Sequence, residues 1–331
     1  MKDEFAFIAN ISPTRTYQPS LQRGIGDDAA VYRGSSEMDE VICVDTFVEG
    51  IHFKKDTMSL RQLGKRVLAV NVSDLAAMGA IPAYYLVSVA VPSLWEENEL
   101  LEVYLGMEEL AKVYKMDLIG GDTVFAAGGG LVLSVTVIGR VEKGKALYRD
   151  EAKPGNVVFL TGQVGSSAAG LSLLLEKGLD GPFNVREQHL VRAHQEPSPH
   201  VDEGRLLVAF RERVALNDVS DGIASELNEL AEASNVRITV EADLLPLHDS
   251  LKAYPRQKQL EWGLFGGEDF VLVGTVASEH AEALKEIFYK HGKQFHEIGF
   301  VEEGKPSVYL KEGDNITPLQ KHGYNHFRNR R

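Results

Sequence analysis

The segment Glu151–Leu175, EAKPGNVVFLTGQVGSSAAGLSLLL, decides how the chain is divided. Its first part, Lys153-Pro154-Gly155-Asn156, interrupts the apolar pattern, because proline and glycine favour turns. An apolar strand is expected next at 157–161 and a helix at 166–175, which indicates the start of a second folding unit. We therefore expect two domains, 1–148 and 149–331, in agreement with a length of 331 residues.

Strand-like and helical stretches alternate on both sides of this border. Further strands are expected at 41–44, 84–91, 131–141, 214–217, 237–240 and 270–276. Further helices are expected at 60–78 (after Ser59), 96–114 (after Ser93), 201–210, 223–234 and 279–290. The alternation predicts a mixed α/β (α+β) fold with one sheet in each half.

The composition is that of an ordinary globular protein, but it is acidic. Hydrophobic residues make up 44% and charged residues 25% of the chain, and the formal net charge is −13. This charge argues against binding to nucleic acid or to an anionic membrane, because both need a basic surface. The acidic first residues and the absence of a long apolar stretch predict a cytoplasmic protein. A single cysteine, Cys43, excludes an internal disulfide and a cysteine metal cage.

Six short acidic motifs stand where a strand or helix is expected to meet a turn. They are Gly26-Asp27-Asp28, Val44-Asp45-Thr46, Asn71-Val72-Ser73-Asp74, Gly120-Gly121-Asp122-Thr123, Asn217-Asp218-Val219-Ser220-Asp221-Gly222 and Gly266-Gly267-Glu268-Asp269. Taken singly, each motif can be structural, since Asp and Ser cap helices and Gly permits turns. Taken together, the carboxylates match the oxygen ligands of magnesium, whereas no His or Cys cluster has the spacing of a zinc site.

Asp74 and the glycine pairs each leave two interpretations open. Asp74 continues the helical face of Leu60, Leu63, Val67 and Val70, so either an inward carboxylate faces a cation or the helix has ended and Asp74 caps the next turn. The glycines at 24, 26, 120–121, 128–130 and 266–267 could let a phosphate approach the backbone or could simply form loops. The sequence has no GxxxxGK[ST] loop and no GxGxxG at a strand-to-helix turn.

Six short strings, taken in their order along the chain, resemble the thiamine-monophosphate kinases. They are GIGDDAA, VDTFVEGIHF, AVNVSDLAAMGA, LIGGDT, VSDGIASEL and GGEDF. The strings extend from Gly24 to Phe270, and Lys153-Pro154-Gly155 and GYNHF at 323–327 support them. The resemblance implies ATP-dependent phosphorylation of thiamine monophosphate to thiamine diphosphate. It also implies a homodimer whose N-terminal sheets join into a barrel, a C-terminal α/β sandwich, and ATP with several magnesium ions in the cleft between the two domains.

Carried over to this sequence, the resemblance implies three groups of site residues. The metal ligands would be Asp28, Asp45, Asp74, Asp122, Asp218 and Asp221, with the backbone carbonyl of Val44, where some members have Thr. The ATP contacts would be Gly121, Asp122, Arg149 and Ser220, and the thiamine-phosphate contacts His52, Glu268 and Tyr324, the last often Trp in the family. Without the resemblance, His52 is interpreted as a surface residue, Arg149 as a linker cation and Tyr324 as a packing residue.

The implied chemistry needs no general base, because the accepting phosphate oxygen is already anionic near neutral pH. Metal ions can offset the repulsion between two phosphates, so we expect direct in-line transfer without a catalytic side chain. Two alternatives are an enzyme like aminoimidazole ribonucleotide synthetase, of the same superfamily, and a sensor that binds nucleotide or thiamine phosphate without turnover. The selenophosphate synthetase and hydrogenase maturation branches depend on a terminal cysteine or selenocysteine that this sequence does not contain.

Overall fold

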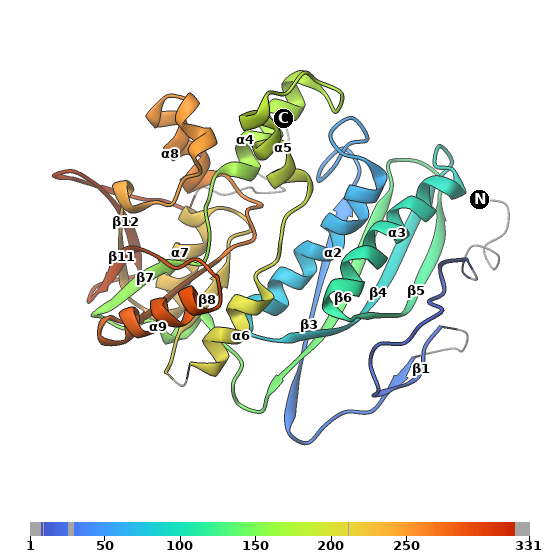
Figure 1. Ribbon diagram of the computed structural model, residues 1–331, viewed down its shortest axis with the longest axis horizontal. Coiled ribbons are helices and arrows are strands. Elements are labelled where there is room, and N and C mark those ends of the chain that lie inside the picture. Colours follow the sequence, from blue (N-terminus) through green and yellow to red (C-terminus); the bar gives the residue numbers. More distant parts are fainter. Residues whose placement is uncertain (1–7, 9, 26–29, 211, 322–331) are drawn as a thin grey trace. The chain divides into compact units, whose positions relative to one another are not determined.

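The chain forms two compact units, each with its own sheet (Figure 1). The computed structural model describes residues 8, 10–25, 30–210 and 212–321. Unit 1 comprises Met1–Leu75 and Ala80–Ala146, and unit 2 comprises Ala76–Gly79 and Leu147–Arg331, as far as these residues are described. The predicted mixed α/β fold is therefore confirmed. None of the described helices is both long and apolar enough to cross a membrane.

Unit 1 is built on a four-stranded sheet with helices on one face. The strands, in their order across the sheet, are β3 (Met38–Val48), β6 (Val132–Glu142), β4 (Ile81–Pro92) and β5 (Asp117–Ala126). Strands β4 and β5 are parallel, and the other two pairs are antiparallel. Helices α2 (Leu60–Ala77) and α3 (Glu97–Tyr114) lie side by side over one face (Figure 1), and β1 (Leu21–Arg23) pairs with β2 (Val31–Tyr32) separately.

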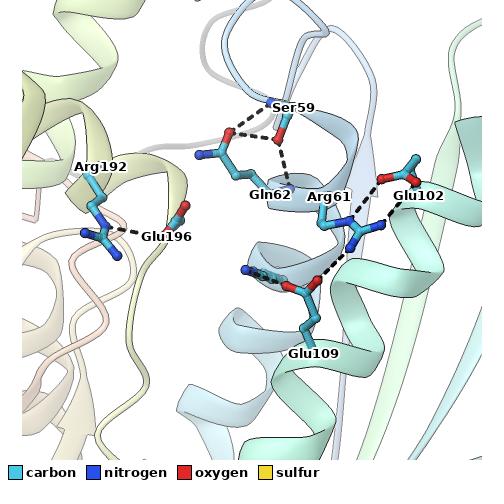
Figure 2. A network of polar contacts seen from close by, with 8 residues as sticks. Ser59, Arg61, Gln62, Glu102, Glu109, Arg192 and Glu196 are labelled. Carbon is cyan, nitrogen blue, oxygen red and sulfur yellow. Dashed lines mark hydrogen bonds and ion pairs between the residues drawn. The ribbon is translucent and has the colours of Figure 1, made fainter.

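Two glycines allow α2 and α3 to pack closely. A Cβ on Gly64 would lie 1.8 Å from the Val103 carbonyl oxygen of α3, and one on Gly106 would lie 2.0 Å from the Arg61 carbonyl oxygen of α2. At the same contact, the Arg61 guanidinium reaches both Glu102 and Glu109 (Figure 2), at 3.0 and 2.8 Å. These exposed ion pairs contribute little to stability, so the close helix contact depends mainly on the glycines.

The starts of both helices are fixed by reciprocal side-chain bonds. The Ser59 hydroxyl accepts the Gln62 N–H at 3.2 Å, and the Gln62 carbonyl oxygen accepts the Ser59 N–H at 3.0 Å (Figure 2), as the sequence predicted for Ser59. The cap predicted at Ser93 was wrong. Helix α3 is capped by Glu96, whose N–H donates to the Glu99 carboxylate at 2.9 Å.

Unit 2 contains a seven-stranded, mostly antiparallel sheet. Its strands, in their order across the sheet, are β13 (Asn315–Pro318), β12 (Ser307–Glu312), β9 (Arg237–Glu241), β11 (His296–Glu302), β7 (Asn156–Leu160), β10 (Leu272–Ala277) and β8 (Ala215–Asp218). Its α-helices are α4 (Ser166–Lys177), α5 (Val185–Gln195), α6 (Val201–Ala209), α7 (Ile223–Ser234), α8 (Arg256–Phe265) and α9 (Ser278–Lys290). Three short 3-10 helices, at Arg149–Glu151, Ala242–Leu244 and Asp249–Ala253, complete its described elements.

Helices cover both faces of the unit 2 sheet. Val158 and Leu160 of β7 belong to a buried core that includes residues of α7 and α8. The side chain between them, Phe159, points to the other face and stacks on Phe295 at 4.8 Å, beside Phe288 of α9. Strand β8, which is fully buried, ends at Asp218 and thus delivers an acidic residue to the edge of this core.

Candidate functional site

In unit 2, two acidic motifs that lie far apart in the sequence are joined by backbone hydrogen bonds. The N–H of Glu268 donates to the Ser220 carbonyl oxygen at 2.7 Å, and the N–H of Phe270 donates to the Val219 carbonyl oxygen at 2.9 Å. Gly267 is required here, because a Cβ would lie 2.3 Å from the Ser220 carbonyl oxygen. The predicted residues Asp218, Ser220 and Glu268 are thereby brought to one place.

A buried carboxylate, Glu226 in the first turn of α7, organises the loop that follows β8. It accepts hydrogen bonds from the Asn217 amide, from the Asp221 N–H at 2.9 Å and from the Ser220 hydroxyl at 3.3 Å. Glu226 is only 3% exposed. The conformation of the Asp218–Asp221 loop is therefore held by the protein itself.

The electrostatics of this loop favour a bound cation. Burial raises the pKa of Glu226 to about 8, and the charge of Asp218 adds to the rise, whereas the hydrogen bond from the Asp221 N–H opposes it. Crowded carboxylates of this kind repel one another, and a divalent cation would relieve the repulsion. Because Asp218 and Asp221 supply the hard oxygen ligands that magnesium prefers, the residues fit that ion.

Arg149, at the start of a short 3-10 helix, belongs to the same cluster. Its Nε donates to the Asn217 carbonyl oxygen at 3.1 Å, and its guanidinium pairs with Glu229 of α7, also at 3.1 Å. Asn217 thus links Arg149 to Glu226. The side chain of Arg149 is still half exposed, so the predicted phosphate contact is available beside the acidic loop.

Glu268 has a strained backbone and two buried polar neighbours. Its φ of +68° is unusual for a residue with a side chain, and such strain is concentrated at functional sites. The Glu268 carboxylate lies 3.6 Å from Nδ1 of His194, and the same nitrogen lies 3.1 Å from the Ser167 hydroxyl. His194 and Ser167 are buried, so they limit the positions that the Glu268 side chain can take.

The neighbouring Asp269 has a structural role. Its carboxylate accepts the N–H of Gly165 at 2.7 Å and of Ser167 at 3.1 Å, which caps the start of α4. Burial raises the pKa of Asp269 to about 7, although these N–H groups oppose the rise. Within one motif, Glu268 and Asp269 therefore have different tasks.

In unit 1, Asp45 and Asp74 lie on neighbouring elements. The Asp45 N–H donates to the Asn71 side-chain oxygen at 3.0 Å, which ties β3 to α2. Asp74 is half-buried and lies within α2, which continues to Ala77. The interpretation of Asp74 as a cap after the end of the helix was therefore wrong, and Asp74 stands about one turn beyond Asn71.

The other predicted residues of unit 1 are distributed over the sheet. Gly121 and Asp122 lie within β5 and are exposed, so the turn expected at this motif was wrong. The Val44 side chain is exposed on β3. His52, in the loop after β3, is half-buried, and its Nδ1 accepts the Val48 N–H at 3.0 Å.

Two predicted site residues, Asp28 and Tyr324, lie outside the described residues. Within each unit, and only among the described residues, no three His, Cys, Asp or Glu side chains are arranged to hold a metal ion. The sequence motifs did not identify Glu226 and His194. Glu226 lies in the quoted string VSDGIASEL. Its position could have indicated a role in the site, because it stands in the first turn of an expected helix, five residues after Asp221.

Comparisons with known proteins match both units. The family AIR synthase related protein, N-terminal domain, matches residues 26–141, and the C-terminal domain of that family matches residues 153–311. The thiamine-monophosphate kinase of Bacillus subtilis (strain 168) is 51% identical over 98% of this chain and 100% of its own length. The chain belongs to the thiamine-monophosphate kinase family. The Escherichia coli (strain K12) member of that family is 34% identical over 98% of both chains.

Solved structures of thiamine-monophosphate kinases share the fold. The crystal structure of the Stenotrophomonas maltophilia K279a member superposes with a TM-score of 0.84 at 34% identity, and covers 93% of this chain and 96% of that one. AaThiL complexed with AMPPCP and TMP superposes with a TM-score of 0.76 at 30% identity, over 92% of this chain and 93% of that one. The family membership inferred from the motifs is thus confirmed over nearly the whole length of this chain.

Proposed function

We propose that this chain transfers the γ-phosphate of ATP to thiamine monophosphate and releases thiamine diphosphate and ADP. The observation that carries the proposal is the junction of the Val219–Gly222 and Gly267–Phe270 loops, which gathers acidic ligands, Ser220 and Glu268 in one place. Arg149 stands beside them through Asn217. The AMPPCP and TMP bound by AaThiL support ATP and thiamine monophosphate as the two substrates.

Each group of residues has a task in this proposal. The acidic residues Asp45, Asp74, Asp122, Asp218 and Asp221, with Asp28 and the Val44 carbonyl, hold magnesium. Bound magnesium supplies the positive charge that allows two phosphate groups to meet and that offsets charge as the bond breaks. Gly121, Arg149 and Ser220 hold the nucleotide, while His52, Glu268 and Tyr324 hold thiamine monophosphate.

The transfer is direct, and no side chain acts as a general base. The accepting oxygen is anionic at neutral pH, so the protein's contribution is to position two anions in line. Trapping after a single turnover with radiolabelled ATP tests this step. We expect no label on the protein, and covalently bound phosphate would contradict direct transfer.

The proposal includes a cytoplasmic homodimer. In unit 1, Ile42 and Val44 expose apolar side chains on the sheet face opposite α2 and α3, and the burial of such groups favours association. The 1–148 region would supply this interface together with nucleotide and metal ligands. The 149–331 region would complete the active site.

A direct assay tests the reaction. The purified protein is incubated with ATP, magnesium and thiamine monophosphate, and thiamine diphosphate and ADP are measured. Asp218→Asn is the matched inactive control, because it removes one charge at constant size. We expect its turnover to fall on the order of 1,000-fold, since a metal ligand provides several kcal/mol of charge stabilisation. Absence of both products with the unchanged protein would contradict the proposal, as would product formation without magnesium.

A further inference from the structure

The segment that carries His52 forms a tight turn directly after β3. The N–H of His52 donates to the Val48 carbonyl oxygen at 2.9 Å, and the N–H of Gly50 donates to the Phe53 carbonyl oxygen at 2.8 Å. Gly50 has a φ of +82°, a conformation that residues with a side chain rarely adopt. We call residues 49–53 the His52 loop. These backbone hydrogen bonds fix its internal shape.

The same loop decides which nitrogen of His52 carries the proton. The Val48 N–H donates to Nδ1 of His52 at 3.0 Å, so Nδ1 is an acceptor and the proton of the neutral ring is on Nε2. The ring is half-buried and lies beside Phe47, with 5.5 Å between the ring centres. A neutral imidazole in this state offers a hydrogen-bond donor at Nε2, which suits an acceptor such as a phosphate oxygen.

A single carboxylate oxygen ties the His52 loop to the rest of unit 1. Oε2 of Glu49 accepts the Leu131 N–H at 2.9 Å and the indole N–H of Trp95 at 2.8 Å. The N–H of Glu49 donates in turn to the Leu131 carbonyl oxygen at 2.9 Å. Leu131 directly precedes β6, and Trp95 lies between β4 and α3. Glu49 therefore joins the loop to two segments that are distant in the sequence.

Trp95 is a fixed partner for this carboxylate. Its side chain is buried, and Nζ of Lys55 lies 3.9 Å from the centre of its ring. Lys55 is held in this position by Glu99 of α3, at 2.6 Å. The indole N–H of a buried tryptophan needs an acceptor, and Glu49 supplies it. The Trp95 side chain therefore anchors the loop to the body of unit 1.

The glycine run at 128–130 is connected to the same contact. A Cβ on Gly130 would lie 2.6 Å from Cβ of Glu49, so a side chain at this position would push the two segments apart. Gly130 thus permits the close approach in which Leu131 and Glu49 exchange two hydrogen bonds. At Gly130, the glycine serves the packing of the His52 loop.

We propose that Glu49 is a positioning residue of the thiamine-monophosphate site. Its carboxylate holds the His52 loop so that Nε2 of His52 faces the substrate. The inference rests on the proposed function, in which His52 contacts thiamine monophosphate. When the loop is released, fewer molecules have His52 in the binding position, and the apparent affinity falls by the same factor. Because substrate binding restores the position, KM changes and kcat does not.

Steady-state kinetics of Glu49 variants test this role. We expect Glu49→Ala to raise KM for thiamine monophosphate about 10-fold, because it removes two hydrogen bonds to a charged acceptor. We expect its kcat and its KM for ATP to stay unchanged. Glu49→Gln is the conservative variant. Both hydrogen bonds end on one oxygen, which the glutamine carbonyl can replace, so its KM should return to that of the unchanged protein.

Two further variants complete the series. Trp95→Phe keeps an aromatic ring and the Leu131 contact but removes the indole N–H, so its KM for thiamine monophosphate should lie between those of Glu49→Ala and the unchanged protein. Asp56→Ala, at an exposed position shortly after the loop, is the matched control and should behave as the unchanged protein. The proposal is overturned if Glu49→Ala keeps its KM, if kcat falls instead, or if Glu49→Gln is as impaired as Glu49→Ala.

Hydrogen–deuterium exchange without any ligand measures the position of the loop directly. We expect the amides of residues 49–53 to exchange about 10-fold faster in Glu49→Ala than in the unchanged protein, because opening becomes more frequent. Glu49→Gln should show the exchange of the unchanged protein, and strand β7 of unit 2 is the internal reference. Equal exchange in Glu49→Ala and the unchanged protein would overturn the proposal.

Calorimetric titration of the unchanged protein with thiamine monophosphate separates this proposal from the proposed reaction. If the exchange results are as expected but thiamine monophosphate does not bind, the proposed substrate is contradicted, whereas the action of Glu49 on the His52 loop is supported. If thiamine monophosphate binds to Glu49→Ala as tightly as to the unchanged protein, the positioning role is overturned and the proposed reaction is unaffected.

Discussion

The two units hold their acidic residues in different ways. In unit 2, the carboxylate of Glu226 accepts three hydrogen bonds from residues 217–221, so the loop has its conformation before any ligand binds. In unit 1, Asp45 and Asp122 project from separate edge strands, and the hydrogen bond from the Asp45 N–H to Asn71 ties only the backbone. The comparison indicates that the acidic loop of unit 2 is held by local side-chain contacts, whereas the two aspartates of unit 1 stand on strands that do not touch each other.

The strongest test of this difference is the removal of the Glu226 carboxylate. We expect Glu226→Ala to lower kcat by about 10- to 100-fold, the usual cost of losing a group that orients metal ligands. Glu232→Ala, an exposed position on the same helix, is the matched control and should leave kcat unchanged. Steady-state kinetics over a range of magnesium concentrations measures the effect. Equal kinetics for both variants would show that the loop does not need Glu226.

The stability of unit 1 is expected to depend on the close packing of α2 against α3. Gly64→Ala places a methyl group against the Val103 carbonyl oxygen, and overpacking of this kind costs about 1–3 kcal/mol of unfolding free energy. Gly34→Ala is the control, because a Cβ at Gly34 meets no atom within 4 Å. Urea unfolding compares the two variants. Equal stabilities would show that the helices can separate without cost.

His194 tests whether unit 2 also orients the substrate side of the site. We expect His194→Gln to raise KM for thiamine monophosphate by up to about 5-fold with little change in kcat, because it removes a polar neighbour 3.6 Å from the Glu268 carboxylate, and a close pair of this kind contributes up to about 1 kcal/mol. His189→Gln, an exposed position on the same helix that stacks on His248, should leave KM unchanged. A fall in kcat at constant KM would contradict a positioning role for His194.

The last test concerns the pH dependence of stability, and it does not involve activity. The pKa of Asp269 rises from 3.8 to about 7 on folding, so the folded protein keeps a proton that the unfolded chain has released. The resulting contribution to stability is complete below pH 3.8 and is lost as pH rises to about 7. Asp269→Asn should flatten this slope in thermal unfolding between pH 5 and 8. An unchanged slope would assign the titration to another group.

Much of the fold was predictable, because long apolar periodic segments such as 60–77 and 84–91 depend little on context. The misses have physical causes. Strand β5 contains Gly120 and Gly121, which are typical of turns, yet Gly121 is needed because a Cβ would lie 2.0 Å from the Val87 carbonyl oxygen. Helix α5 is mostly polar, and α8 contains Gly263, so neither showed a clear apolar face. Strands β11 to β13 likewise went unpredicted.

The site residues were predictable by type but not by arrangement. The acidic motifs identified oxygen ligands, whereas strand order decides which of them can meet. That Asp45 and Asp122 stand at opposite edges follows from the order β3-β6-β4-β5, which a single sequence does not contain. Glu226 was missed because a lone glutamate in a helix resembles a surface residue until its burial is known.

The Asp269 cap on α4 limits where the chain can bind a nucleotide phosphate. A strand, a short turn with glycine and the first N–H groups of a helix form the arrangement in which many proteins hold a phosphate group. Between β7 and α4, those N–H groups are already taken by the carboxylate of Asp269. The polypeptide thus carries its own substitute for a phosphate at this point. The triphosphate must then find its counter-charge elsewhere, and cations held by the aspartates, as proposed above, would supply it in place of a glycine cradle.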